Sequence, residues 1–290
     1  MGKVAVVIPV YGQWHLVKKN VDALIYFDNE FINEIIIVDD CSPVVNPFHF
    51  NDVVTIIRNS SNLGYTATVN NGLRRAKSDV IILLDSDAYP IRAFINDVVS
   101  IYEKNSTVGC IGFGTVDDLG NNTGNFQYEP SVLGYVLGQK LQALFNLRLN
   151  NNIIPYSCAV SFRKVCLIEM EYFDENTFPV LDADIDLSMN IHRSQWKLIF
   201  DHKIIVSHKG GNSYKVNYKR VNLYHHSRWN LLRKHNQLQA PFFIKFLLNA
   251  RVILEIFIFY SLKVLKYKKS NYSEKILGRR ILLSEIKNYS

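Results

Sequence analysis

Two aspartates that flank a serine, Asp85-Ser86-Asp87, directly follow the apolar stretch Val80–Leu84. Carboxylates spaced in this way at a strand end can share a hard divalent cation. Oxygen ligands suit Mg²⁺ or Mn²⁺, which in turn bridge phosphate oxygens. A short Asp-x-Asp sequence is also common in solvated acidic turns, so the tripeptide alone leaves both interpretations open. Its place behind an apolar strand favours a metal and phosphate site.

A second acidic group, Asp182, Asp184 and Asp186, lies at the start of a predicted helix over Asp184–Ser194. Aspartates commonly cap helix N-termini, which is one explanation. The other is a general base whose pKa is raised by the neighbouring carboxylates. Three acids among apolar neighbours are costly unless a cation or a substrate uses them, which favours the functional interpretation.

Further polar side chains lie at two other strand ends. Asp39 and Asp40 close the stretch Glu34–Val38, where they could accept hydrogen bonds from a base N–H and sugar hydroxyls, or cap a turn. His208 follows the stretch Ile204–Ser207 and could ligate a metal. A lone histidine is more often structural, and this alternative stays open.

The elements that would position these residues alternate between strands and helices in the first half of the chain. Strands are expected over Val4–Ile8, Glu34–Val38, Val53–Ile57, Val80–Leu84 and Val108–Phe113, and helices over His15–Phe27, Thr66–Ala76 and Ile91–Glu103. Continuous Val, Ile and Leu strands between amphipathic helices indicate a mostly parallel α/β sheet with helices on both faces. Such sheets bind ligands beyond the carboxyl ends of their strands.

The second half of the chain is predicted to be less regular at first and then helical. Residues 116–152 are rich in Asn, Gly and Asp and are predicted to form a long active-site loop. A strand is expected over Tyr156–Phe162, and two separate strands over Lys197–Phe200 and Ile204–Ser207. Beyond Asn217 the chain is predicted to be helical and basic.

Taken in order, these motifs resemble those of the family 2 glycosyltransferases with the GT-A fold, particularly the bacterial rhamnosyltransferase-like members. The matching pieces are Pro9-Val-Tyr11, Val38-Asp-Asp-Cys-Ser42, Asn62-Leu-Gly-Tyr65, Asn70-Asn-Gly72, Asp85-Ser-Asp87, Asp182-Ala-Asp-Ile-Asp-Leu187, Trp196, Val206-Ser-His208 and the segment from Tyr224 to His235. The resemblance covers roughly residues 4–236. Each motif is weak alone, and their order and spacing make the combination strong.

The resemblance implies a donor site for a nucleotide-diphospho-sugar, with UDP and dTDP as the candidate nucleotides. Pro9, Tyr11 and Asp39 would line the base pocket. The other donor-binding positions implied are Asn62, Gly64, Asn70, Asp85 and Ser86. The acceptor would be a saccharide or a lipid-linked sugar, and the product a bacterial surface polysaccharide.

The resemblance also implies a metal site and a catalytic base for transfer with inversion. Asp87 and His208 would hold Mn²⁺ or Mg²⁺, and Asp85 would approach either the ribose or the metal. Asp184 matches the second residue of the family's Glu-Asp motif, which supplies the base. Ala183 stands where the family has Glu, so Asp182 is an alternative source of that carboxylate.

Two other classes of function compete with a glycosyltransferase. A sugar nucleotidyltransferase can share this sheet, but it normally needs a Gly- and Arg-rich loop after the first strand, and Pro9-Val-Tyr-Gly12 does not supply one. A degenerate binding module would keep the fold without turnover, which the retention of Asp85, Asp87, Asp184 and His208 argues against. No Gly-x-Gly-x-x-Gly follows the first strand, as a dinucleotide oxidoreductase would need.

The charge is distributed unevenly along the 290 residues. The chain has 33 Lys and Arg against 26 Asp and Glu, a net charge of +7. Residues 200–290 carry 18 basic against 4 acidic residues, whereas residues 1–199 carry 15 against 22. We therefore expect a GT-A catalytic domain over residues 1–215 and a basic helical extension over residues 216–290, with no nucleic-acid partner.

The predicted helix after Phe242 has two unlike sides. Lys245, Asn249, Arg251, Glu255, Lys263 and Lys266 fall on one side of a helical wheel, and Phe242, Phe243, Phe246, Leu247, Val252, Ile253, Ile256 and Phe257 lie mainly on the other. This pattern is typical of a helix on an anionic membrane surface. Packing on the catalytic domain or in a homodimer is the equal alternative. The four cysteines are widely spaced, which indicates reduced thiols and a cytoplasmic protein. If the helix contacts a membrane, we expect the protein to be peripheral on the inner face of the cell membrane.

Overall fold

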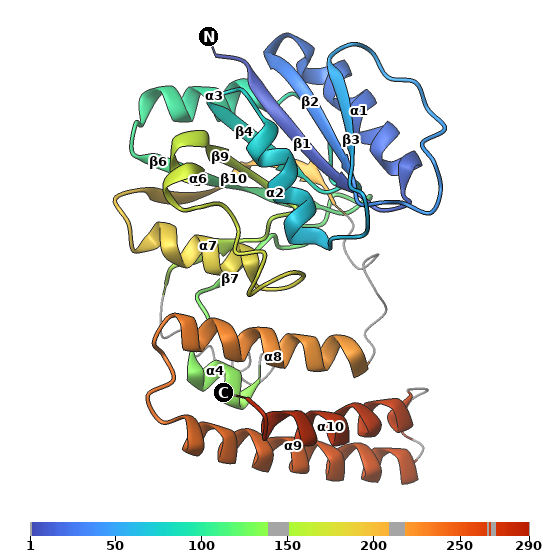
Figure 1. The fold of residues 1–290 in the computed structure, drawn as a ribbon, viewed down its shortest axis with the longest axis vertical. Helices are drawn as coiled ribbons and strands as arrows, with labels where there is room; N and C mark the ends of the chain where they lie inside the picture. The colour runs from blue at the N-terminus through green and yellow to red at the C-terminus, as the bar shows by residue number, and fades with distance from the viewer. Residues whose placement is uncertain (1, 139–150, 209–217, 266, 268–270, 290) are drawn as a thin grey trace. The chain divides into compact units, whose positions relative to one another are not determined.

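The computed structural model describes residues 2–138, 151–208, 218–265, 267 and 271–289 (Figure 1). The chain divides into two compact units. Unit 1 comprises Met1–Glu129 and Asn152–Gly210, and unit 2 comprises Pro130–Asn151 and Gly211–Ser290. The expected division at residue 215 placed residues 130–151 with the sheet, whereas the structure groups them with the C-terminal helices. The catalytic role of residues 1–215 stays a prediction.

Unit 1 is built on an eight-stranded sheet in the order β3-β2-β1-β4-β9-β6-β10-β5. The strands are β1 (Val4–Val10), β2 (Ile32–Asp39), β3 (Val54–Arg58), β4 (Val80–Leu84), β5 (Tyr89–Pro90), β6 (Val108–Val116), β9 (Ala159–Arg163) and β10 (Lys197–Ser207). Strands β3, β2, β1 and β4 run parallel, as do β6 and β10. Strand β9 lies antiparallel between β4 and β6, and β5 pairs antiparallel with β10. The sheet is therefore mostly parallel, as expected.

Helices cover both faces of this sheet (Figure 1). They are α1 (Trp14–Asp28), α2 (Tyr65–Arg75), α3 (Ile95–Lys104), α6 (Lys164–Glu169) and α7 (Ala183–His192), with a 3₁₀ turn at Asn29–Phe31. Successive side chains of a strand point to opposite faces. Val6 of β1 accordingly lies in one buried cluster with Leu24 of α1, whereas Val7 lies against Gly72 of α2.

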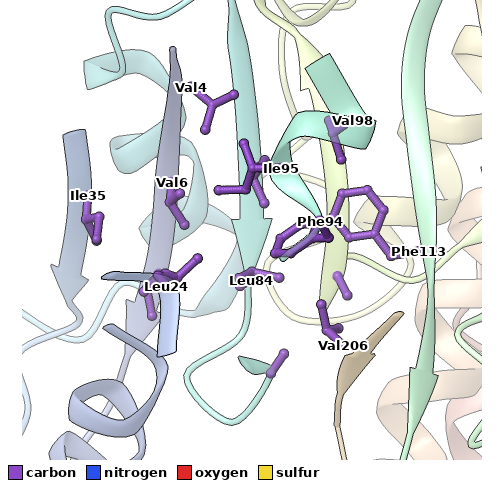
Figure 2. Close-up of a cluster of buried hydrophobic side chains, with 14 of the residues drawn as sticks. Val4, Val6, Leu24, Ile35, Leu84, Phe94, Ile95, Val98, Phe113 and Val206 are labelled. Carbon is purple, nitrogen blue, oxygen red and sulfur yellow. The ribbon is translucent and has the colours of Figure 1, made fainter. Parts of the chain in front are cut away.

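The main core lies between the sheet and helices α1 and α3 (Figure 2). Phe94, next to the start of α3, meets Phe113 of β6 edge to face, with ring centroids 5.6 Å apart. The buried carboxylate of Asp28, at the end of α1, accepts the backbone N–H groups of Phe94 and Ile95. This contact fixes where α3 begins, because it satisfies donors that a helix N-terminus leaves open.

Three of the expected elements differ in the structure. The helix expected from Ile91 begins at Ile95, since the chain just before it forms β5 against β10. The two strands expected after Lys197 form one strand, β10, with an irregularity between Asp201 and Ile205. The break expected between the two strands is this irregularity, which does not end β10.

The expected loop over residues 116–152 also contains regular structure within its described part. Strand β7 (Phe126–Tyr128) pairs antiparallel with β8 (Ile153–Pro155), and α4 spans Val132–Leu137. Phe126 packs on Phe200 of β10, with ring centroids 4.9 Å apart, which anchors β7. The remainder of that loop, residues 139–150, lies outside the described residues.

Unit 2 is helical, as expected for the end of the chain. The helices among its described residues are α4, α8 (Tyr218–Lys234), α9 (Pro241–Val264) and α10 (Tyr272–Ile286). Tyr135 of α4 and Trp229 of α8 share a buried core with Leu248 and Leu282. The hydroxyl of Tyr135 donates to the carbonyl of His225 at 2.8 Å. Within the described residues, no helix is both long enough and apolar enough to cross a bilayer.

Candidate active site

The turn that carries Asp85 and Asp87 is held at the end of β4 by backbone contacts. The N–H of Asp85 donates to the carbonyl of Cys158 at 2.9 Å, and the N–H of Ala88 closes the turn on the carbonyl of Asp85 at 2.9 Å. From α1, the buried amide of Asn20 donates to the carbonyls of Asp85 at 3.1 Å and Ala88 at 2.6 Å. The turn is therefore fixed by the backbone and by α1, which leaves the two carboxylates for other partners.

His208 reaches this turn because β10 pairs with β5. Ser207 lies opposite Tyr89 in that antiparallel pair, so the next residue, His208, lies beside the turn. Its Nε2 is 3.4 Å from Oδ1 of Asp87. One ligand atom each of Asp85, Asp87 and His208 lie within 4.8 Å of one another. Two carboxylates and an imidazole at this spacing fit Mn²⁺ or Mg²⁺.

The protonation of these three groups reflects their burial and mutual contacts. Burial raises the pKa of Asp85 to about 6, against the lowering effect of the hydrogen bond from Tyr65. Burial lowers the pKa of His208, but the hydrogen bond and charge of Asp87 outweigh it, and the net shift is upward. A cation bound by Asp85, Asp87 and His208 would displace protons from these side chains, because metal binding and protonation compete for the same atoms.

A chain of hydrogen bonds leads from Asp85 to Asp184. The hydroxyl of Tyr65 donates to Oδ1 of Asp85 at 2.8 Å and lies 3.0 Å from Oγ of Ser157. Because the tyrosine proton is used on Asp85, Ser157 is the donor in the second contact. The backbone N–H of Ser157 then donates to Oδ2 of Asp184 at 3.2 Å. Two acidic sites far apart in sequence are thereby joined through the side chain of Tyr65 and through the side chain and backbone of Ser157.

Asp184 lies in the first turn of α7 and faces the connection between β8 and β9. Its Oδ1 also accepts the N–H of Ile185 at 2.9 Å. Burial, and after it the neighbouring charge of Asp182, raise the pKa of Asp184 to about 6. A carboxyl group with this pKa is unprotonated at neutral pH and basic enough to take a proton during a reaction.

Asp182 and Asp186 are also buried at the start of α7, and a backbone hydrogen bond joins them. Asp182 precedes α7 in the left-handed backbone conformation, with φ of 66°, and its carbonyl accepts the N–H of Asp186 at 2.9 Å. Asp182 thus closes the first turn of α7 through its backbone. The structure places it next to Asp184, whose contact with Ser157 links Asp184 to the cluster of Asp85, Asp87 and His208.

The residues expected at the nucleotide base lie at the ends of β1 and β2. Pro9 lies within β1, and Tyr11, directly after that strand, is 52% exposed. The carboxylate of Asp39 accepts the N–H of Ser42 at 2.8 Å and pairs with Arg58 of β3. The structure therefore places these three residues at adjoining strand ends, with Asp39 held in a fixed orientation.

Asp40 has a role that its motif did not indicate. Its carboxylate accepts the N–H groups of Leu63 at 2.7 Å and Gly64 at 3.0 Å, and the amide of Asn59 at 3.0 Å. Gly64 adopts φ of 88°, a conformation that favours glycine. Asp40 thus shapes the loop before α2 and so places Tyr65, while Asn62 in the same loop is exposed.

Asn70 is buried in the fold, whereas Ser86 lies in the turn after β4. Asn70 is fully buried, and its amide donates to the carbonyl of Phe173 at 2.8 Å while its oxygen accepts the N–H of Phe173. Both ends of this amide bond to the backbone of Phe173, and the structure does not bring Asn70 into the cluster of Asp85, Asp87 and His208. Ser86 is in the turn itself and donates to Oε1 of Gln13 at 3.3 Å.

Three residues at this site were missed by the sequence reasoning. In the sequence, Tyr65 is only the last residue of the motif Asn62-Leu-Gly-Tyr65, and no motif contains Ser157 or Gln13. The signal for Ser157 is weak, because its position depends on β9 entering the sheet antiparallel beside β4. Tyr65 follows a glycine at the start of a predicted helix, a place where a polar ring would face the strand ends.

The chain is similar in sequence and in fold to known glycosyltransferases. Residues 5–175 match the sequence profile of the family described as Glycosyl transferase family 2. A protein of Haemophilus influenzae described as an "Uncharacterized glycosyltransferase" is 36% identical over 80 residues. That alignment covers 27% of this chain and 27% of the relative, so it spans about a quarter of the relative's length.

Solved structures share the fold at low sequence identity. The mannosyltransferase PcManGT from Pyrobaculum calidifontis, solved with GDP-Man and Mn²⁺, superposes with a TM-score of 0.60 at 15% identity, over 99% of this chain and 87% of its own. GalNAc-T7, solved with UDP, GalNAc and Mn²⁺, gives a TM-score of 0.56 at 16% identity, over 77% and 47%. These similarities show a common GT-A fold.

Proposed function

The chain belongs to glycosyl transferase family 2, and from this premise we propose that it is an inverting glycosyltransferase. It would move a sugar from a nucleotide-diphospho-sugar, with UDP or dTDP as nucleotide, to a hydroxyl of the acceptor. The observation that carries the proposal is the link from the Asp85, Asp87 and His208 cluster through Tyr65 and Ser157 to Asp184. It joins a group that could hold a metal ion to a carboxylate of suitable basicity.

The cluster would serve the leaving group. Asp87 and His208, with Asp85 as a third ligand, would hold Mn²⁺ or Mg²⁺. When bound, the cation neutralises the negative charge that develops on the departing diphosphate. The Mn²⁺ in the PcManGT and GalNAc-T7 structures supports this assignment. The donor's nucleotide would lie toward Pro9, Tyr11 and Asp39.

The remaining donor-binding assignments rest on the motifs. Asn62, Gly64 and Ser86 lie in loops at the ends of the strands, where they could contact the donor. For Asn70 the burial and the bonds to Phe173 favour an indirect role through the fold.

Asp184 would serve the acceptor. Its carboxylate takes the proton of the attacking hydroxyl as the new bond to the anomeric carbon forms. The bond from that carbon to the diphosphate oxygen breaks at the same time, and its electron pair leaves with the diphosphate. One base and one metal site suffice for this direct displacement, which inverts the anomeric configuration. A retaining glycosidase would instead place paired carboxylates on either side of a sugar.

The acceptor and the cellular role extend the proposal beyond the donor site. We infer a saccharide or lipid-linked acceptor in the synthesis of a bacterial surface polysaccharide, with a rhamnosyltransferase-like specificity. A lipid-linked acceptor would bring the enzyme to an anionic membrane surface on its cytoplasmic side. The basic excess in residues 200–290 supports that contact.

The experiment that tests the proposal measures donor binding and donor turnover together. We expect one nucleotide sugar in a panel to raise the melting temperature only with Mn²⁺, because a ligand of the folded state stabilises it by mass action. The same donor should slowly release free nucleoside diphosphate. Asp87→Ala should abolish the Mn²⁺-dependent binding in calorimetry, and His208→Ala should weaken it, while Asp52→Ala, at an exposed carboxylate, should not.

Two outcomes would contradict it. Unchanged binding of donor and Mn²⁺ by Asp87→Ala would show that the metal site is elsewhere. Formation of pyrophosphate from a nucleoside triphosphate and a sugar phosphate would identify a nucleotidyltransferase, whereas donor binding without any release of nucleoside diphosphate would identify a binding module.

A further inference from the structure

Helix α9 has its charged side turned into unit 2. Lys245 donates to the carbonyl of Tyr289. Arg251 pairs with Glu255 at 3.1 Å, and Arg279 of α10 binds the same carboxylate at 2.7 Å. Three of the four charged residues of α9 are therefore engaged by neighbouring helices of the unit. A surface helix of a globular protein normally has the opposite arrangement, with charges outward.

The opposite side of α9 is exposed and apolar. It consists of Phe242, Phe246, Ile253, Phe257, Tyr260 and Val264, which we call the outward face. At 100° per residue these six positions lie within an arc of roughly 60°. Phe242 is 87% exposed, Phe246 65% and Phe257 66%. Isolated exposed apolar residues are common, but a continuous row of this size marks an interaction surface.

We propose that the outward face of α9 docks on an anionic lipid bilayer, with the helix lying in the plane of the interface. A helix of 24 residues is about 36 Å long, so its aromatic row can enter the headgroup region along its full length. The inward charges, meanwhile, stay paired within the protein. This placement differs from a membrane span, which the charged residues of α9 would oppose.

Charge favours a bilayer over a second copy of the chain. Residues 200–290 have an excess of 14 positive charges, from 18 basic and 4 acidic residues. Two copies that met through this face would bring like charges together, whereas anionic headgroups would attract them. Exposed Lys263, at the end of α9, is positioned to contact headgroups beside the apolar row. Apolar insertion and electrostatic attraction are the two terms that bind interfacial helices.

Substitutions on the outward face test this without disturbing the core. Removing α9 and α10 would also remove Leu248, Val252 and Leu282 from around Trp229, so a truncated chain would confuse unfolding with lost binding. We would measure co-sedimentation of Phe246→Asn/Phe257→Asn with vesicles of phosphatidylcholine alone and with 30% phosphatidylglycerol. Tyr26→Asn and Leu119→Asn are matched controls, at residues 81% and 86% exposed in unit 1.

We expect the wild type and both controls to bind the anionic vesicles. The double variant should bind them at least about tenfold more weakly, with an unchanged melting temperature and unchanged donor binding. Equal sedimentation of wild type and double variant would overturn the proposal. Failure of the wild type to bind either kind of vesicle would also overturn it. A wild-type dimer that Phe246→Asn/Phe257→Asn converts to a monomer would then identify the outward face as a dimer interface. This test is independent of catalysis, so its failure would leave the transferase assignment standing.

Discussion

Asp184 is costly to keep as a charged group. Burial raises its pKa to about 6, which means that the fold disfavours the very form that exists at neutral pH. The contact with Ser157 at 3.2 Å holds the carboxylate without removing that cost. Perturbed acids of this kind concentrate at functional sites, and this supports a chemical role over simple capping of α7.

Replacement of Asp184 separates binding from chemistry. Asp184→Asn keeps the shape and removes the basicity, so kcat should fall by about 10²–10⁴-fold, the usual contribution of a general base. The donor's dissociation constant should be nearly unchanged, since the role is confined to the transition state. Steady-state kinetics with calorimetry would measure both. Asp182→Asn is the comparison, and a large loss there with a mild effect at Asp184 would make Asp182 the base. Turnover near wild type in both variants would remove this segment from the chemistry.

The same two residues predict a pH profile. With its pKa raised to about 6, Asp184 is protonated below that pH, so kcat at saturating donor and Mn²⁺ should fall as pH drops through about 6. Because the charge of Asp182 is one cause of the raised pKa, Asp182→Asn should move this acid limb to lower pH. Burial is the larger cause, so the limb should remain above its position for an exposed aspartate. A limb that does not move would show that the titrating group is not Asp184.

Tyr65 is predicted to position the base relative to the metal site. Tyr65→Phe keeps the ring and removes the bonds to Asp85 and Ser157, so kcat should fall by roughly tenfold or more, because small displacements of reacting groups are costly. Tyr102→Phe is matched to it, since it removes a buried hydroxyl contact with Ser161 at 3.1 Å away from the site. Both variants should lose about 1 kcal/mol of stability, but kcat should fall only in Tyr65→Phe. An equal kcat in the two would leave Tyr65 a purely structural role.

At the scale of elements, the strands were predictable because buried parallel strands leave unbroken apolar runs. The runs near Val4, Glu34 and Val80 became β1, β2 and β4. Direction was not predictable, since an apolar run such as Tyr156–Phe162 reads the same for a parallel and an antiparallel strand. The antiparallel placement of β9 brings Ser157 beside β4, so the bridge to Asp184 stayed hidden in the sequence.

The candidate site, like the sheet, could be predicted from the sequence only in part. The family resemblance predicted that Asp87 and His208, with Asp85 nearby, would meet at the strand ends, and the structure brings their ligand atoms together. Their roles, and that of Asp184, stay predictions. Asn70 also lies in a motif that resembles the family's, yet its amide bonds to the backbone of Phe173. The two residues are 103 apart in the chain, and sequence periodicity does not reveal such a contact.

Gly72 ties the packing of α2 to the site. A Cβ added there would lie 2.4 Å from Cγ1 of Val7 and 2.9 Å from Cγ2 of Val38, so Gly72→Ala must move α2 away from the sheet. Overpacking of this kind costs about 1–3 kcal/mol, and it should also lower kcat because α2 begins at Tyr65. Gly114→Ala is the control, since its new Cβ would make only ordinary contacts, at 3.5 Å or more. Chemical denaturation would measure both, and equal stabilities would show that α2 adapts without strain.

At the scale of the molecule, chemistry and surface attachment are assigned to different units. The acidic half of the chain holds the strand ends, where carboxylates suit a cation, and the basic half holds the outward face of α9. The segment 130–151 leaves unit 1 and joins unit 2, and α4 within it is bound by Arg251 of α9. Each unit has its own buried core, and we therefore expect each to respond separately to a ligand or a substitution.

Hydrogen exchange should show this separation. Arg251 donates to the carbonyls of Tyr135 at 2.7 Å and Val136 at 3.0 Å, and to Nε2 of His225 at 3.2 Å. Arg251→Ala should therefore speed amide exchange in α4, α8 and α9 while β1, β4 and β6 keep their wild-type rates, because proteins open locally in cooperative parts. Arg280→Ala, at an exposed residue of α10, should leave both units unchanged. Nucleotide sugar with Mn²⁺ should slow exchange around the ends of β4 and β10 in wild type and Arg251→Ala alike. Faster exchange spread evenly over both units in Arg251→Ala would instead show that they open as one cooperative structure. That result would contradict the expectation that the two units respond separately.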